Sequence, residues 1–110
     1  MSTIKNFEAM LARGQDSGLL RFGLGNAYLG QDDPDRAIPH LAEAVRLTPG
    51  YSAAWKLYGK ALSAAGRQTE AITALDQGIA TAEAKGDIQA AKEMQVFRRR
   101  ALKALDAEEG

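Results

Sequence analysis

The chain has 110 residues, enough for one modest domain. Fourteen basic side chains balance fourteen acidic ones, so no overall field draws the protein to nucleic acid or to an anionic lipid surface. The absence of cysteine excludes disulfides, thiolate metal sites and a thiol nucleophile. The first residues lack the pattern of a secretory signal, and no apolar stretch approaches the roughly 18 residues of a membrane span. We therefore expect a soluble, cytoplasmic protein.

The first helix is predicted to begin at Ser2 or Thr3, whose hydroxyl groups can cap it, and to end in the segment 14–17. Four apolar residues at helical spacing share one of its faces. They are Ile4, Phe7, Met10 and Leu11. A second helix is predicted from about Gly18 to Leu29, with Gly30 as a left-handed stop. Its buried stripe consists of Leu20, Leu24, Ala27 and Tyr28.

The third helix begins at a strong start signal, because the carboxylate of Asp33 can cap it and Pro34 suits its first turn. Pro39 lies inside this helix and predicts one missing backbone hydrogen bond and a slight bend. The segment 48–50, Thr-Pro-Gly, breaks the chain sharply. The residues expected to point inward are Ala37, Ile38, Leu41, Ala44, Val45 and Leu47.

Three more helices complete the prediction, with Gly66 and Gly86 marking the turns between them. The fourth covers about 52–65 and buries Ala54, Trp55, Tyr58, Ala61 and Leu62. The fifth covers about 68–85 and buries Ala71, Ile72, Leu75 and Ile79. The sixth follows the capping residue Asp87 and runs to Leu105, with Ala90, Met94, Phe97, Ala101 and Leu105 as its stripe. We expect the tail, 106–110, to be frayed.

Five residues recur after 34 positions without a gap. Gly25, Ala27, Ala37, Ile38 and Leu41 return as Gly59, Ala61, Ala71, Ile72 and Leu75. A period of this length is typical of helical repeat proteins, in which each unit buries its apolar face on the next. The small residues allow neighbouring helices to cross closely, while larger side chains pack around the crossing.

Both units resemble the tetratricopeptide repeat, whose pattern is W-x2-L-G-x2-Y, then A-x3-F, then P. The first unit reads Arg21-x2-Leu24-Gly25-x2-Tyr28, Ala37-x3-Leu41, Pro49, and the second reads Trp55-x2-Tyr58-Gly59-x2-Leu62, Ala71-x3-Leu75. The first unit has Arg21 where tryptophan is typical, and both phenylalanine places hold leucine. The second unit has Glu83 where the first has Pro49, which predicts a longer last helix.

The resemblance implies an all-α fold of about six helices, in which antiparallel hairpins stack as a short right-handed solenoid. It divides a single domain, 1–110, into a half-repeat or capping helix at 3–17, one repeat at 18–51, a second at 52–85 and a capping helix at 87–105. Because three repeats are usually needed for a stable solenoid, we expect the flanking helices to cover the apolar ends.

In this family the first helices of the repeats line a concave groove that often holds an extended peptide. On that resemblance the ligand-binding residues are Leu19, Phe22, Asn26, Leu29, Lys56, Lys60 and Ser63, with Ala53 beside them. The groove would have an apolar end at Leu19 and Phe22 and a basic end at Lys56 and Lys60, which suits an acidic or carboxylate-bearing segment.

Some relatives hold a C-terminal carboxylate with a clamp of lysine, asparagine and arginine. Here only Asn26 matches that clamp. Phe22 and Leu57 replace two of its residues, and counting the period places Asp87 and Ala90 at the remaining basic positions. A clamp for a chaperone tail is therefore not predicted.

The pattern favours a non-catalytic protein–protein interaction module, such as an adaptor, a scaffold or a co-chaperone-like factor, without a cofactor or a catalytic residue. The alternatives are a homodimer through the terminal helices, seeded by Val96, and binding of nucleic acid through basic residues on the fourth and sixth helices. Neither His40, the single histidine, nor the acidic turn of Asp32, Asp33 and Asp35 has the spacing of a metal site. The run 98–100, three arginines, points in three directions on a helix and does not form one patch.

Overall fold

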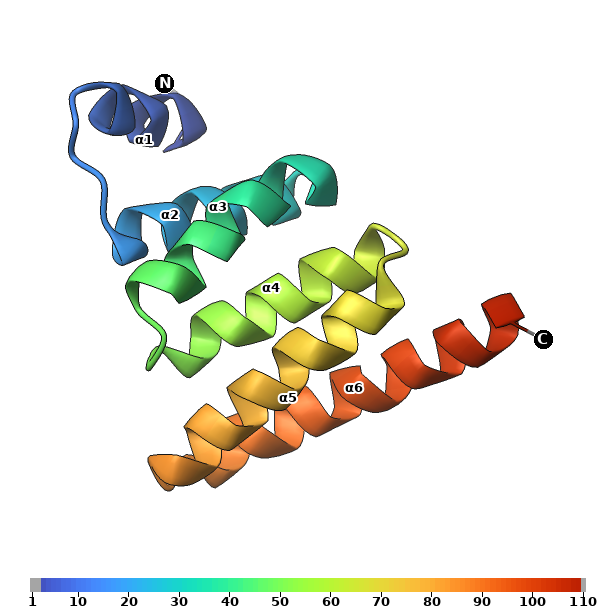
Figure 1. The fold of residues 1–110 in the computed structure, drawn as a ribbon. Coiled ribbons are helices and arrows are strands. Elements are labelled where there is room, and N and C mark those ends of the chain that lie inside the picture. The colour runs from blue at the N-terminus through green and yellow to red at the C-terminus, as the bar shows by residue number, and fades with distance from the viewer. Residues whose placement is uncertain (1–2, 110) are drawn as a thin grey trace.

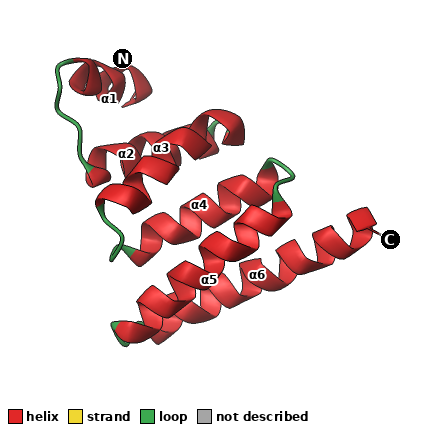
Figure 2. Cartoon of the chain, in the orientation of Figure 1, coloured by secondary structure: helices red, strands yellow, loops and turns green. Residues whose placement is uncertain are grey.

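The computed structural model describes residues 3–109, which form six helices and no strand (Figure 1; Figure 2). The helices are α1 (Thr3–Ala12), α2 (Gly18–Gly30), α3 (Pro34–Leu47), α4 (Ser52–Ala64), α5 (Gln68–Ala84) and α6 (Ile88–Glu109). Each predicted helix is therefore present, and most ends lie within one or two residues of their predicted positions.

Capping side chains mark the starts of α2, α3 and α6, whereas α4 and α5 begin without one. The Ser17 hydroxyl accepts a hydrogen bond from the backbone N–H of Leu20 at 3.1 Å, and the Asp87 carboxylate accepts one from Ala90 at 3.1 Å. The carboxylate of Asp33 accepts from the backbone of Arg36 at 3.2 Å, next to a proline in the first turn of α3. These bonds satisfy backbone donors that have no partner within the helix.

The predicted stop at Gly30 is wrong. Gly30 is the last residue of α2 and is not left-handed, whereas Asp32 has a φ of 56°. The backbone N–H of Asp33 bonds to the carbonyl of Tyr28, which closes the helix end around Asp32. Gly66, with a φ of 80°, ends α4 in the same way, and it stands 34 positions after Asp32.

The predicted fraying of the tail is also wrong for the residues that the structure describes. Helix α6 continues through 106–109, beyond the predicted end at Leu105. Residue 110, and the cap assigned to Ser2, lie outside the described residues. The extension consists of three acidic residues and one alanine, with no proline or glycine to stop the helix before 110.

The helices stack as two hairpins, α2–α3 and α4–α5, with α3 packed on α4 and α6 packed on α5 (Figure 1). Glycine allows the close crossing within each hairpin. A Cβ atom placed on Gly59 would lie 2.6 Å from the Leu75 side chain, and one placed on Gly25 would overlap Leu41. The small residues of the repeat therefore act as predicted, by letting a leucine of the second helix touch the backbone of the first.

The core runs through the stack and is filled by large aliphatic side chains. The largest fully buried ones are Leu24, Leu41, Leu62, Leu75 and Met94. Trp55 and Tyr58 were predicted to be buried but are only half-buried, because one side of each borders a surface hollow described below. Ile72 and Ile79 are half-buried as well.

The last helix is out of register with the 34-residue period. Ser52 begins α4 34 residues after Gly18 begins α2, but Ile88 begins α6 36 residues after Ser52. The difference arises because α5 has 17 residues where α3 has 14, while the connection to the next helix is one residue shorter. At the observed offset Met94 stands at the place of Tyr58, which agrees with its burial.

Candidate functional site

Helices α2, α4 and α6 lie next to one another, since α4 contacts both α2 and α6. We call the surface that these three helices share, away from α3 and α5, the inner face. The residues that the sequence predicts to bind a ligand come from two of these helices, α2 and α4. The structure shows how each of them lies and which neighbours it has.

On α2 the inner face is apolar and open. Leu19 is 71% exposed, which is unusual for a leucine, and Asn26 is exposed beside it. The Phe22 ring packs at a tilt against Tyr51, with 5.0 Å between the ring centroids, and Leu29 is half-buried. The predicted apolar end of the groove thus has one fully available side chain and one aromatic ring held in place.

A first hollow of about 270 Å³ lies between the N-terminal halves of α4 and α6. It is lined by Ser52, Ala53, Lys56, Asp87, Gln89, Ala90, Glu93 and Met94. Across it the Lys56 ammonium donates to the Glu93 carboxylate at 2.9 Å, and this hydrogen bond lowers the pKa of Glu93. Gln89 donates to the same carboxylate at 3.3 Å. The charge of Lys56 is therefore compensated within the protein.

A second hollow, of about 250 Å³, lies farther along the same pair of helices. Its lining consists of Gly59, Lys60, Ser63, Ala64, Leu75, Phe97 and Arg100. The Lys60 ammonium lies 5.2 Å from the centroid of the Phe97 ring, and the Arg100 guanidinium lies 5.6 Å from it. No carboxylate of the described residues pairs with either cation. The hollow thus combines an apolar floor with two available positive charges.

Ser63 has a structural contact as well as a place on the inner face. Its hydroxyl donates to the side-chain carbonyl of Gln68 at 2.7 Å, and the Gln68 amide donates back to the Ser63 carbonyl at 3.1 Å. Gln68 is buried, so this pair closes the α4–α5 turn without leaving a buried polar atom unsatisfied.

Phe97 and Arg100 were not among the predicted site residues. The 34-residue period places Asp87 and Ala90 on the groove side of α6, whereas the observed offset moves the equivalent positions to Gln89 and Lys92. The length of the predicted fifth helix could have revealed the shift. No proline follows it at the place where Pro49 follows the third helix, so the fifth helix is longer and moves the sixth along the chain.

A third hollow, of about 470 Å³, lies on the opposite side of α4, against α5. It is lined by Trp55, Tyr58, Leu62, Thr69, Glu70, Thr73, Ala74 and Gln77. The Trp55 indole N–H donates to the carbonyl of Pro49 at 2.8 Å, and its ring lies 6.5 Å from that of Tyr58. The sequence did not predict this hollow, because it assigned both aromatic residues to the core.

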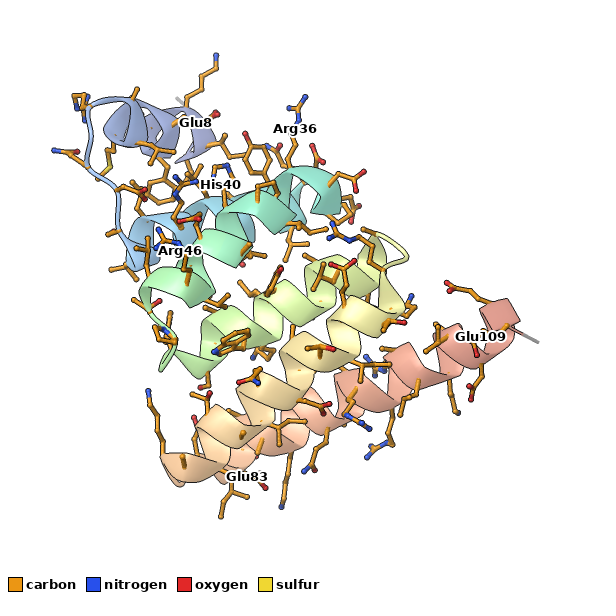
Figure 3. The ribbon with its side chains drawn as sticks, in the orientation of Figure 1. Glu8, Arg36, His40, Arg46, Glu83 and Glu109 are labelled. Atoms are coloured by element: carbon orange, nitrogen blue, oxygen red, sulfur yellow. The ribbon has the colours of Figure 1, made fainter. Side chains whose placement is uncertain are left out.

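His40 has a structural explanation. Arg21 bonds Asp16 through two contacts of 2.9 and 3.1 Å, and its guanidinium donates to Nδ1 of His40 at 3.2 Å. The imidazole also stacks on Tyr28, with 5.7 Å between centroids, on the side of α3 toward α1 (Figure 3). Burial and the nearby arginine lower the pKa of His40, so the ring is neutral at physiological pH. In residues 3–109 no cluster of acidic, histidine or cysteine residues could hold a metal ion.

The three consecutive arginines diverge as predicted. Arg98 pairs with Asp76 of α5 at 2.6 Å, Arg100 lies over Phe97, and Arg99 is exposed. Two of the three are therefore used within the fold. None of the helices in the described part of the chain is both long and apolar enough to cross a membrane.

Comparison with known proteins agrees with the stacked hairpins. The sequence profile of the tetratricopeptide repeat matches residues 4–52 and 22–88. The chain belongs to the tetratricopeptide repeat family. It is 54% identical over 97 residues to a TPR repeat-containing protein of Pseudomonas aeruginosa, an alignment that covers 88% of this chain and 92% of the relative.

Solved structures show the same tetratricopeptide repeat fold. The solution structure of a Bordetella parapertussis protein superposes with a TM-score of 0.79 at 44% identity, over 94% of this chain and 90% of that one. MamA superposes with a TM-score of 0.70 at 25% identity, over 94% of this chain and 58% of MamA. YrrB, described as a TPR protein with an unusual peptide-binding site, superposes with a TM-score of 0.65 at 23% identity, over 97% of this chain and 64% of YrrB.

Proposed function

We propose that this tetratricopeptide repeat protein is a non-catalytic interaction module that binds a segment of a partner protein on its inner face. Repeats of this family generally mediate protein–protein interaction, and the hollows between α4 and α6 offer a place for side chains of such a segment. The proposed contact residues are Leu19, Phe22, Asn26, Leu29, Lys56, Lys60 and Ser63, to which the geometry adds Phe97 and Arg100. We propose a cytoplasmic location for this interaction, with which the absence of cysteine is compatible.

The observation that carries the proposal is the pair of cations around Phe97. Lys60 and Arg100 flank one aromatic ring above a hollow whose floor includes Leu75. A carboxylate would bind between the cations, and an apolar group beside it would fill the hollow. The favoured ligand is therefore a peptide with an acidic group next to an apolar side chain.

Two features support binding along the whole face rather than at one point. Leu19 offers an exposed apolar contact on α2, at the other end of the face from the cations. YrrB, which is described as a TPR protein with an unusual peptide-binding site, has a fold of the same architecture. With so few repeats we expect micromolar affinity, about −8 kcal/mol.

The test is capture of a partner from a source-cell lysate by the wild type and by Lys60→Glu/Arg100→Glu. Arg13→Glu/Lys85→Glu makes the same charge change at exposed residues outside the hollows and serves as the matched control. The proposal expects one protein to be retained by the wild type and the control and lost by the inner-face variant, with all three equally helical by circular dichroism.

Other outcomes would contradict the proposal. Equal retention by all three proteins would place the contact outside the second hollow, for example on the α4–α5 side. If sedimentation shows a homodimer whose formation displaces the retained partner, self-association is favoured. Steeply salt-dependent retention of nucleic acid would favour the remaining alternative, a nucleic-acid-binding protein.

A further inference from the structure

A row of positive charge runs along the side of α6 that no described element covers. Lys92, Val96, Arg99 and Lys103 recur at spacings of four, three and four residues, so they share one face of the helix over about 16 Å. We call these four residues the end face. The three basic side chains are exposed, Val96 is half-buried, and no ion pair among residues 3–109 involves any of them.

The equivalent positions of α4 lie next to a neighbouring helix, which shows what such positions contact. At the observed offset of 36 residues, Lys92 and Val96 correspond to Lys56 and Lys60. On α4 the neighbouring helix supplies Glu93 to the first of these positions, at 2.9 Å, and Phe97 to the second, at 5.2 Å. A helix packed alongside thus pairs the cation at the first position with a carboxylate and places an aromatic ring against the second position.

We propose that the end face docks an amphipathic helix of a different protein, with glutamates or aspartates on both sides of an apolar stripe. The carboxylates would pair with Lys92, Arg99 and Lys103, as Glu93 pairs with Lys56, and the apolar stripe would cover Val96. Lys92 borders the inner face, but the end face shares no residue with the contact residues proposed above.

Charge selects this occupant over two others. In a twofold-symmetric pairing through this face, the three cations of one copy would meet the three of its partner, and like charges repel. Nucleic acid would need a broader basic surface, whereas Arg98 is paired with Asp76 and the chain has no net charge. An apolar residue at the centre of the row also suits a protein helix better than a phosphate backbone.

The test uses a fluorescently labelled synthetic helix of about 20 residues, with leucines in one stripe and glutamates beside it. A scrambled peptide of the same composition keeps the charge and loses the stripe. Fluorescence anisotropy is measured with the wild type, with Lys92→Glu/Lys103→Glu, and with Arg13→Glu/Lys85→Glu, which makes the same charge change elsewhere on the exposed surface. Circular dichroism checks that every variant is folded.

The proposal expects the wild type to bind the amphipathic peptide and the end-face variant to bind it roughly tenfold more weakly. The control variant should bind as the wild type does. Val96→Ser should weaken binding, because it removes the apolar contact at the centre of the row.

Any of four results would overturn it. Equal binding of the scrambled peptide, or equal loss in both charge variants, would mean non-specific attraction of a polyanion. Unchanged binding by Lys92→Glu/Lys103→Glu would place the peptide elsewhere. Tighter binding of a DNA duplex or of phosphatidylserine vesicles than of the peptide, lost in the same variant, would assign the end face to phosphate groups instead.

Discussion

Replacing Gly78 by alanine tests whether the three C-terminal helices are as closely packed as the structure indicates. A Cβ atom at this position would lie 2.7 Å from the Cβ of Trp55 and would overlap the sulfur of Met94. Met94 can move, but the Cβ of Trp55 is fixed to the α4 backbone, so α4 and α5 must separate slightly. Overpacking of this kind typically costs 1–3 kcal/mol, while alanine gains about 1 kcal/mol of helix propensity over glycine. We expect a net destabilisation of about 1 kcal/mol, with a melting temperature lower by about 5 °C.

Gly30→Ala is the matched control, since Gly30 also lies in a helix and a Cβ atom there would meet nothing within 4 Å. Without a clash the gain in helix propensity remains, and the variant should be more stable by up to about 1 kcal/mol. Urea unfolding followed by circular dichroism at two protein concentrations measures both changes. If Gly78→Ala proved as stable as Gly30→Ala, the close packing of α4, α5 and α6 inferred from the structure would be refuted.

Three further predictions concern the helix ends and the polar contacts. Deleting 87–110 should unfold the domain, because it uncovers the apolar side of α5, and a cooperative melt of the shortened chain at the wild-type temperature would contradict this. His40 has a lowered pKa in the folded state, so below about pH 6.5 the unfolded chain binds more protons than the folded protein. The free energy of unfolding should therefore fall as the pH drops through this range. The urea midpoints of His40→Gln should lack this part of the pH dependence. Lys56→Met and Glu93→Gln should be coupled in a double-mutant cycle at low salt, with the coupling reduced by added salt; additive effects would show that the ion pair does not form in solution.

Local signals were enough to predict the helices and several of their ends. Asp33 and Asp87 cap α3 and α6, since a carboxylate just before a helical pattern can accept hydrogen bonds from the first backbone N–H groups of the helix. Gly66 ends α4 as expected. The predicted stop at Gly30 is wrong because glycine is the usual left-handed residue at a helix end, whereas here Asp32 occupies the position equivalent to Gly66.

The candidate site was harder to predict because it depends on how helices distant in sequence are placed. The period predicts Lys60 as a groove residue, but its neighbours in the second hollow, Phe97 and Arg100, come from a helix that is two residues out of register. The ion pair between Lys56 and Glu93 removes one of the two charges that the sequence assigned to the basic end. Such pairing depends on side chains 37 positions apart and has no sequence signature.

The attachment of α1 has a consequence for how the domain opens. Its backbone approaches α2 alone among the described helices, and of its residues only Ile4 is buried. Local opening of a peripheral helix costs much less than global unfolding when little apolar surface holds it. Native-state hydrogen exchange should therefore show α1 opening first, while α2 to α6 exchange together, so the smallest unit that unfolds cooperatively begins near Gly18 rather than at the first helix.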